Sequence, residues 1–122
     1  MREIKFRAWD SQNKQMYDVH TLGLSDSKRS IIIKGNDSQT AREIVGEYPL
    51  MQFTDLLDKN GKEIYESDLV LINKKNWSGI KEVIWDDFFL CWTPKTLRTT
   101  KETIDFEIIG NIYENPELIA LN

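Results

Sequence analysis

Cysteine and histidine are almost missing from the chain, which has one of each among its 122 residues. A single thiol cannot form an intrachain disulfide. Cys91 lies between Leu90 and Trp92, a setting typical of a buried structural cysteine in a reducing compartment. No two histidines or cysteines stand at the spacing of a zinc motif. The sequence therefore argues against both a disulfide-held fold and a structural zinc site.

Long apolar runs are also lacking. No stretch approaches the roughly 18 apolar residues of a membrane-spanning helix. Residues 1–7 alternate charged and apolar side chains and lack the continuous apolar segment of a signal peptide. There is no internal repeat, low-complexity tract or Pro/Gly-rich linker. We therefore expect a soluble, cytoplasmic protein that folds as a single domain over residues 1–122.

The chain is rich in core-forming side chains and slightly acidic. Hydrophobic residues make up 40% of it and aromatic residues 11%, enough to bury a core. The net charge of −4 is uneven, since residues 74–101 carry six basic and three acidic groups whereas residues 102–122 carry five acidic groups and no basic one. The acidic total argues against a general DNA-binding protein, because phosphate neutralisation dominates such affinity. A local basic patch remains compatible with it.

Period-two alternation and β-branched runs predict a chain made mostly of strands. We expect strands at residues 4–8, from residue 16 onward, and at residues 31–33, 50–54, 69–72, 80–85, 88–93 and 106–110. Residues 10–14 are typical of a turn, and residues 20–29 and 73–79 of polar loops. Residues 38–45 are compatible with a short helix and with a strand.

The strongest local signal is the turn at residues 58–62, Asp-Lys-Asn-Gly-Lys. Asn60 and Gly61 both tolerate positive φ, so the pair is typical of a tight hairpin. An EF-hand calcium loop is the alternative, with Asp58 and Asn60 as ligands ahead of Gly61. Its first position, which must be aspartate, then falls on Leu56, and the pattern fails. We interpret the segment as a solvated hairpin turn.

The close spacing of the strands after residue 63 predicts the fold. About five strands within about 50 residues, joined by tight turns, are typical of a small barrel. Residues 69–72 are apolar at every position, as in a strand covered on both faces. Asn115 followed by Pro116 predicts the start of a helix. The expected architecture is mainly β, with a small SH3-like barrel core over residues 63–112, an N-terminal β extension and a short C-terminal helix.

Three sequence blocks together resemble the YopX family of phage and prophage proteins. They are residues 1–10, residues 50–70 with the turn described above, and residues 106–118, which read Phe-Glu-Ile-Ile-Gly-Asn-Ile-Tyr-Glu-Asn-Pro-Glu-Leu. The blocks lie in the family's order and span nearly the whole chain. The resemblance implies a mostly β, barrel-containing fold and a phage or prophage origin, hence a bacterial cytoplasm. It implies no activity that can be carried over residue by residue.

Two positions depart from the family pattern. The family usually has glycine where this chain has Asp55, and commonly where it has Ser67. Glycine adopts positive φ without steric cost, and aspartate tolerates that region better than serine does. If both positions need positive φ, the strain is therefore greater at Ser67.

Few residues combine into a catalytic group. His20 as base and Cys91 as nucleophile form one candidate, but His20 falls in a predicted polar loop and Cys91 in an aromatic strand. The adjacent carboxylates at residues 86–87, or Glu66 with Asp68, could act as acid and base. Carboxylates at such places are more often solvated or cap turns. We therefore expect no enzymatic activity, no catalytic residue, no metal and no cofactor.

One segment has the composition of a nucleic-acid surface. Basic side chains beside an aromatic ring can hold a phosphate backbone and stack a base. The candidate residues are Lys74, Lys75, Trp77, Lys81, Lys95 and Arg98. A nucleic-acid-binding module using residues 74–101 is the alternative hypothesis, because a net charge of +3 is modest for such a role.

The apolar run at residues 88–93 favours a different function. A strand that is apolar on both faces is either covered within its own domain or contacts another chain. A small domain has little interior with which to cover both faces. The candidate self-association residues are Phe88, Phe89, Leu90 and Trp92. The preferred hypothesis is a non-enzymatic phage or prophage accessory protein that acts through a protein partner or as a homo-oligomer.

Overall fold

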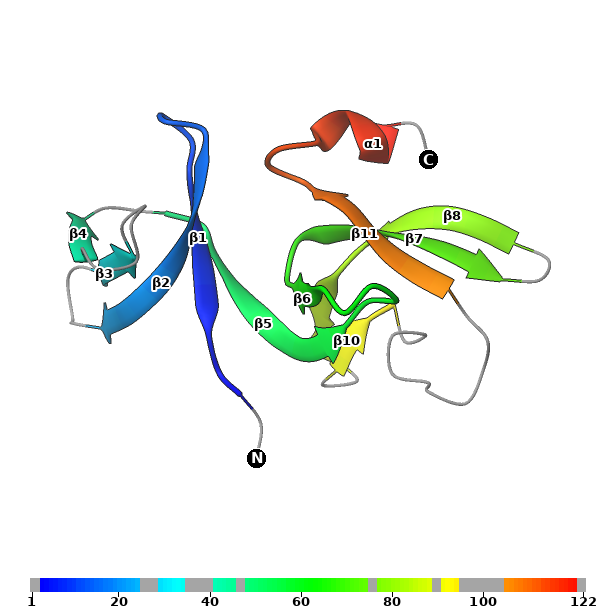
Figure 1. Cartoon of the computed structure of the whole chain (residues 1–122), viewed down its shortest axis with the longest axis horizontal. Coiled ribbons are helices and arrows are strands. Elements are labelled where there is room, and N and C mark those ends of the chain that lie inside the picture. Colours follow the sequence, from blue (N-terminus) through cyan, green and yellow to red (C-terminus); the bar gives the residue numbers. More distant parts are fainter. Residues whose placement is uncertain are drawn as a thin grey trace. The chain divides into compact units, whose positions relative to one another are not determined.

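The structure is a computed structural model that is mainly β, as the sequence predicts. It describes residues 3–24, 29–34, 41–45, 48–74, 77–88, 91–94 and 105–120. These residues form eleven strands and one short helix (Figure 1). No helix in these described ranges is long and apolar enough to cross a membrane. The chain divides into two compact units, one formed by Lys5–Gln52 and the other by Met1–Ile4 with Phe53–Asn122, which are described in turn.

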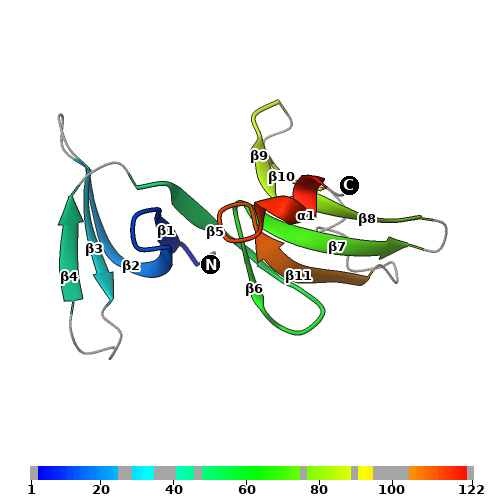
Figure 2. The ribbon, with the colours of Figure 1, turned by 90° about the horizontal axis from the view of Figure 1, so that it is seen from above.

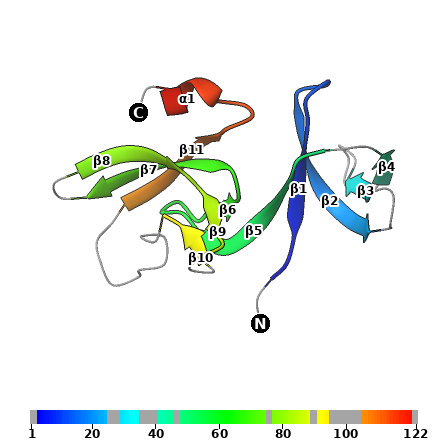
Figure 3. The ribbon, with the colours of Figure 1, turned by 180° about the vertical axis from the view of Figure 1, so that it is seen from behind.

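Antiparallel pairing builds the unit Lys5–Gln52. Its strands are β1 (Phe6–Asp10), β2 (Gln15–Leu24), β3 (Arg29–Lys34), β4 (Ala41–Val45) and the start of β5 (Leu50–Leu57). They pair in the order β4-β3-β2-β1-β5 (Figure 3). Ala8 of β1 is fully buried, and half-buried side chains pack around it from Tyr17, Val19, Leu22, Tyr48 and Leu50. A small residue at this position leaves room for the larger side chains around it.

The turn between β1 and β2 confirms the prediction for residues 10–14. Asp10 Oδ1 accepts the backbone N–H of Gln12 at 3.0 Å and of Asn13 at 3.2 Å, while Asp10 Oδ2 accepts the Asn13 side-chain amide at 2.8 Å. Lys14 closes the turn with a φ of 55°. An aspartate whose side chain satisfies the N–H groups two and three residues later is a common hairpin device.

Two predictions in this unit need correction or completion. The predicted loop at residues 20–29 is wrong for its described residues, since β2 continues to Leu24 and pairs with β3, which begins at Arg29, on both sides of a bulge between Val19 and Thr21. Residues 25–28 lie outside the described residues. Of the segment 38–45, residues 38–40 lie outside the described residues, and residues 41–45 form β4 rather than a helix. In both places the hydrogen bonds come from the neighbouring strand β3, so the composition of the segment itself does not reveal them.

The second unit contains the remaining elements. They are the end of β5, then β6 (Glu63–Tyr65), β7 (Asp68–Lys74), β8 (Trp77–Glu82), β9 (Ile84–Asp86), β10 (Cys91–Thr93), β11 (Asp105–Asn111) and α1 (Pro116–Ala120). β7 is central, pairing with β11 on one side and β8 on the other (Figure 2). Leu69, Val70 and Ile72 are buried and Leu71 is half-buried, which confirms the prediction of a strand covered on both faces.

The core of this unit gathers apolar side chains from five strands and from Val83, which lies between β8 and β9. Its buried members are Ile64, Val70, Ile72, Val83 and Trp92, against which Leu56, Phe106 and Ile108 pack. The predicted SH3-like barrel is not confirmed. Closure requires the outer strands to pair with one another. In the described ladders, β8 pairs with β7 alone and β10 with β9 alone, so these sheets stay open.

Several boundaries differ from those predicted. The predicted loop 73–79 is mostly strand, because β7 extends to Lys74 and β8 begins at Trp77. The predicted strand 80–85 is interrupted at Val83, whose N–H donates to the Asp68 carbonyl and whose carbonyl accepts the Ser67 N–H, both at 2.8 Å. Of the predicted strand 88–93, Phe88 lies in a turn, residues 89–90 lie outside the described residues, and β10 begins at Cys91. The predicted C-terminal helix is confirmed as α1, which lies next to β8.

Both departures from the family's glycines have positive φ. Asp55 has a φ of 67° and Ser67 one of 74°. Ser67 sits in the turn between β6 and β7, where its carbonyl also accepts the Ile112 N–H at 3.1 Å. Backbone hydrogen bonds from two other segments, at Val83 and Ile112, therefore hold a serine in a conformation that suits glycine and offset the local strain.

Glycine at position 67 should stabilise the protein. We expect Ser67→Gly to raise the free energy of unfolding by about 0.5–1 kcal/mol, because the relief of positive φ exceeds the entropy that glycine adds to the unfolded chain. Gly61→Ala is the converse variant. Gly61 has a φ of 80° and open space where a Cβ would lie, so a loss of about 1 kcal/mol would come from the backbone alone. Urea unfolding measures the free energy of unfolding of both variants. A Ser67→Gly variant less stable than the wild type would contradict the claim that the backbone is strained at Ser67.

Candidate functional site

The turn between β5 and β6 is a tight five-residue connection. The Asp58 N–H donates to the Lys62 carbonyl at 2.9 Å, and the Gly61 N–H donates to the Asp58 carbonyl at 3.0 Å. Of these five residues only Gly61 has positive φ, although Asn60 would also tolerate it. The pattern is the three-residue hairpin loop in which a type I turn precedes a left-handed glycine. The hairpin itself is confirmed, with Leu56 opposite Ile64.

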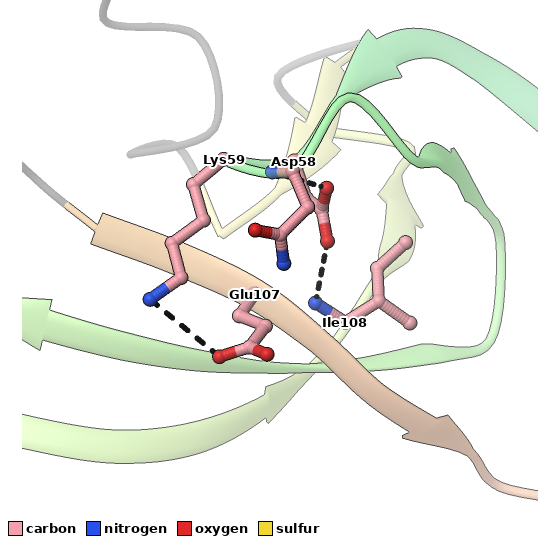
Figure 4. A network of polar contacts seen from close by, with 5 residues as sticks. Asp58, Lys59, Glu107 and Ile108 are labelled. Atoms are coloured by element: carbon pink, nitrogen blue, oxygen red, sulfur yellow. Dashed lines mark hydrogen bonds and ion pairs between the residues drawn. The ribbon is translucent and has the colours of Figure 1, made fainter.

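The Asp58 carboxylate ties this turn to β11. Its Oδ1 accepts the N–H groups of Asn60 and Lys62, each at 2.9 Å. Its Oδ2 accepts the Ile108 N–H at 3.0 Å (Figure 4). The Lys59 N–H donates to the Phe106 carbonyl at 3.1 Å. Asp58 is only 7% exposed. The turn therefore docks on the outer edge of β11 through both backbone and side-chain hydrogen bonds.

Opposing effects act on the protonation of Asp58. Burial raises the pKa of Asp58. The hydrogen bonds from the N–H groups of Ile108, Lys62 and Asn60, together with the charge of Lys62, lower the pKa by more than burial raises it. The net result is a pKa below the usual aspartate value, so Asp58 is ionised at neutral pH. The nearby ion pair between Lys59 Nζ and Glu107 Oε2 spans 3.6 Å, with both side chains about two-fifths exposed. Such an exposed pair adds little to stability.

The carboxylates that suggested catalysis are partly engaged in the backbone. Asp68 is 2% exposed, and its Oδ2 accepts the Tyr65 N–H at 2.7 Å across the β6–β7 turn. Glu82 has a raised pKa, first because of burial and second because of the negative charge of Glu66. In the part of the chain that the structure describes, no three His, Cys, Asp or Glu side chains are grouped to hold a metal ion. Asp68 thus caps the β6–β7 turn, as Asp58 caps the β5–β6 turn.

The end of β11 contains a second hydrogen-bonded turn. Asn111 Oδ1 accepts the N–H groups of Tyr113 at 3.0 Å and Glu114 at 2.9 Å, and Asn115 Oδ1 accepts the Asn111 N–H at 3.3 Å. Gly110 lies directly against the Asn115 side chain, which a Cβ at position 110 would overlap. The Gly-Asn-Ile-Tyr-Glu-Asn segment is therefore a packed turn that leads into α1.

The basic candidates are only partly placed. Lys74 and Trp77 face each other across the β7–β8 ladder, where the structure describes their backbone alone. Lys81 is exposed on β8. Lys75, Lys95 and Arg98 lie outside the described residues. The ladder thus brings one lysine and one tryptophan to the same end of a hairpin.

The self-association candidates are divided by the β9–β10 turn. Phe88 is 85% exposed, and its N–H donates to Asp86 Oδ1 at 2.9 Å. Trp92 is 8% exposed and belongs to the core, whereas Phe89 and Leu90 lie outside the described residues. Cys91 is buried, which confirms its interpretation as a buried cysteine.

Sequence reasoning missed two exposed apolar residues on the same hairpin. Ile84 is 47% exposed and Trp85 39% exposed. Trp85 stands opposite Trp92, with the rings edge to face and their centroids 5.1 Å apart. If the predicted strand at residues 80–85 had been divided at Val83, Ile84 and Trp85 would have fallen on a separate two-stranded hairpin. Ile84 and Trp85 follow one another in β9 and therefore lie on opposite faces of the hairpin. The exposed apolar residues of this hairpin, Ile84, Trp85 and Phe88, are called the β9–β10 patch below.

Comparison with known proteins agrees with the resemblance seen in the sequence. A family model described as YopX protein matches residues 5–120. The chain belongs to the YopX family. A similar solved structure of 30% sequence identity is the crystal structure of protein EF1440 from Enterococcus faecalis, with a TM-score of 0.64 and coverage of 98% of this YopX chain and 99% of that chain. No curated protein matches the chain.

The ionised Asp58 should make stability depend on pH. Because its folded pKa lies below the unfolded value of about 3.9, its contribution is present above that pH and is lost as pH falls through the folded pKa. We expect Asp58→Asn to lower the free energy of unfolding by about 1.5–3 kcal/mol at neutral pH, and by progressively less below about pH 4. Urea unfolding across this range measures the difference. Glu107→Gln is the control, with an expected effect below about 0.5 kcal/mol. If Asp58→Asn lowers the free energy of unfolding by the same amount at every pH, the lowered pKa of Asp58 is contradicted.

Proposed function

We propose that this YopX-family chain is a non-enzymatic accessory protein of phage or prophage origin that acts in the bacterial cytoplasm by self-association. The observation that carries the proposal is the exposure of Phe88 beside Trp85 and Ile84. Single apolar residues at a surface are ordinary, but a short hairpin that exposes apolar side chains on both faces and at its turn is well placed to contact another protein. The capping roles of Asp58 and Asp68 support a non-enzymatic function.

The β9–β10 patch is well suited to be an anchor. The edge-to-face contact with Trp92 restrains the Trp85 ring, and the Asp86 carboxylate fixes the backbone at Phe88. Restrained aromatic side chains lose little entropy on binding and are common energetic centres of interfaces. A two-fold dimer would place the same patch of each copy against the other. Asp86 and Asp87 would then approach their counterparts, so salt should strengthen the association.

Removing the aromatic ring at position 88 should weaken a dimer. We expect Phe88→Ser to raise the dimer dissociation constant about tenfold or more, as loss of a central aromatic anchor does. Leu57 is 53% exposed and lies outside the patch, so Leu57→Ser should leave the dissociation constant unchanged. Size-exclusion chromatography with light scattering over micromolar concentrations measures this. A monomeric wild type at all concentrations would reject self-association, and equal effects of both variants would reject the patch.

A nucleic-acid-binding module is the second candidate function. It is supported by the register that sets Lys74 opposite Trp77, with Lys75 next in sequence. A fluorescence titration with single- and double-stranded oligonucleotides at low salt tests it, because phosphate contacts are strongest there. If this module binds, Lys74→Ala with Lys75→Ala should weaken binding, and Lys14→Ala, a lysine outside the segment, should not. Absence of binding at about 50 µM, within the usual non-specific range, would reject the candidate.

A further inference from the structure

The turn between β5 and β6 contains the single Asn-Gly dipeptide of the sequence, Asn60-Gly61. Asparagine before glycine is chemically labile, because the glycine nitrogen can reach the asparagine side-chain carbon without a Cβ in the way. Other asparagines precede larger residues, as in Asn13-Lys14 and Asn73-Lys74. Asn60 and Gly61 are both exposed, so water reaches the site. These features make Asn60 a candidate for spontaneous modification.

The geometry of the loop opposes that reaction. The Gly61 N–H, whose nitrogen would attack, donates to the Asp58 carbonyl at 3.0 Å. The Asn60 N–H is held by Asp58 Oδ1 at 2.9 Å, and the same oxygen holds the Lys62 N–H. Attack requires the Gly61 nitrogen to lose its proton and turn toward Asn60 Cγ. Both steps require the hydrogen bonds around Asp58 to open first.

We propose that Asn60 is a deamidation site whose rate is controlled by Asp58, slow in the closed loop and fast when the loop opens. In the first step the Gly61 nitrogen gives up its proton and bonds to Asn60 Cγ, and the side-chain nitrogen leaves as ammonia. Water then adds to either carbonyl of the resulting five-membered imide. The products are aspartate or isoaspartate at position 60, with one water consumed and one ammonia released overall.

The modification would act on the contact between the turn and β11. Aspartate at position 60 places a second negative charge beside Asp58, and isoaspartate lengthens the backbone by one carbon. Either change disturbs a loop whose hydrogen bonds extend to the Ile108 N–H and the Phe106 carbonyl. Like charges at short range are repulsive, and the loop has no spare length. Deamidation should therefore favour further opening of the same turn.

The test compares deamidation rates at mildly alkaline pH. The full chain is incubated folded and in urea, and peptide mapping by mass spectrometry follows Asn60, with chromatographic separation of the aspartate and isoaspartate forms. We expect Asn60 to react about tenfold or more slowly in the folded chain, since losing a hydrogen bond to a charged group changes an open population by about that factor. Gly61→Ala in urea should react more slowly than the wild type, because alanine hinders the attack.

Variants of Asp58 separate its role from that of folding in general. Folded Asp58→Ala should deamidate at Asn60 about tenfold faster than folded wild type. Asp58→Asn, which keeps an oxygen acceptor at position 58, serves if the alanine variant fails to fold, and it should also be faster. Glu107→Gln, which removes only the exposed ion pair to Lys59, should match the wild type. Equal rates for folded and unfolded wild type, earlier reaction at another asparagine, or unchanged rates in a folded Asp58 variant would each overturn the proposal.

Discussion

The carboxylate of Asp58 connects parts of the chain that lie 50 residues apart. One oxygen organises the turn that reverses β5 into β6, and the other accepts a backbone N–H from β11. β11 in turn pairs with β7, the central strand of its sheet. A single buried anion therefore links a local hairpin to a sheet formed much later in the sequence. Its three N–H donors outweigh the cost of burial, which is why the group stays ionised.

The same device recurs at other turns. The side chain of Asp10 caps the β1–β2 turn, that of Asp68 caps the β6–β7 turn, and that of Asn111 caps the segment before α1. In each case a short side chain accepts backbone N–H groups that the turn would otherwise leave unsatisfied. Part of the acidic excess of this YopX chain is thus architectural. Asp68 and Asp86, each one member of a carboxylate pair that the sequence offers for acid–base chemistry, accept backbone N–H groups in the structure.

The apolar run around the β9–β10 turn shows how one sequence pattern is divided between two roles. Trp92 and Cys91 enter the interior, while Phe88 remains almost fully exposed a few residues earlier. Hydropathy is similar for these side chains, so composition alone does not separate them. The distinction comes from the turn at Asp86, which directs Phe88 outward before β10 begins. An interior residue stabilises the fold, whereas an exposed aromatic ring is available to a partner.

The amino-acid sequence alone determined the features that depend on neighbouring residues. The mainly β class, the turns at residues 10–14 and 58–62, the buried strand at residues 69–72 and the helix at Pro116 all follow from local periodicity and turn chemistry. The positive φ at Ser67 was also foreseeable, because glycine is usual there in the resembling family. These features need no information about distant strands.

Only the tertiary structure decided which strands pair and which carboxylates are engaged. β2 and β4 form where a polar loop and a possible helix were expected, because β3 supplies their hydrogen bonds. The described sheets remain open where a barrel was expected, since in the described ladders β8 pairs with β7 alone and β10 with β9 alone. The bond from Ile108 to Asp58 has no local signature either. Strand partners and long-range acceptors both lie outside the segment that they stabilise, so the pattern of that segment alone cannot specify them.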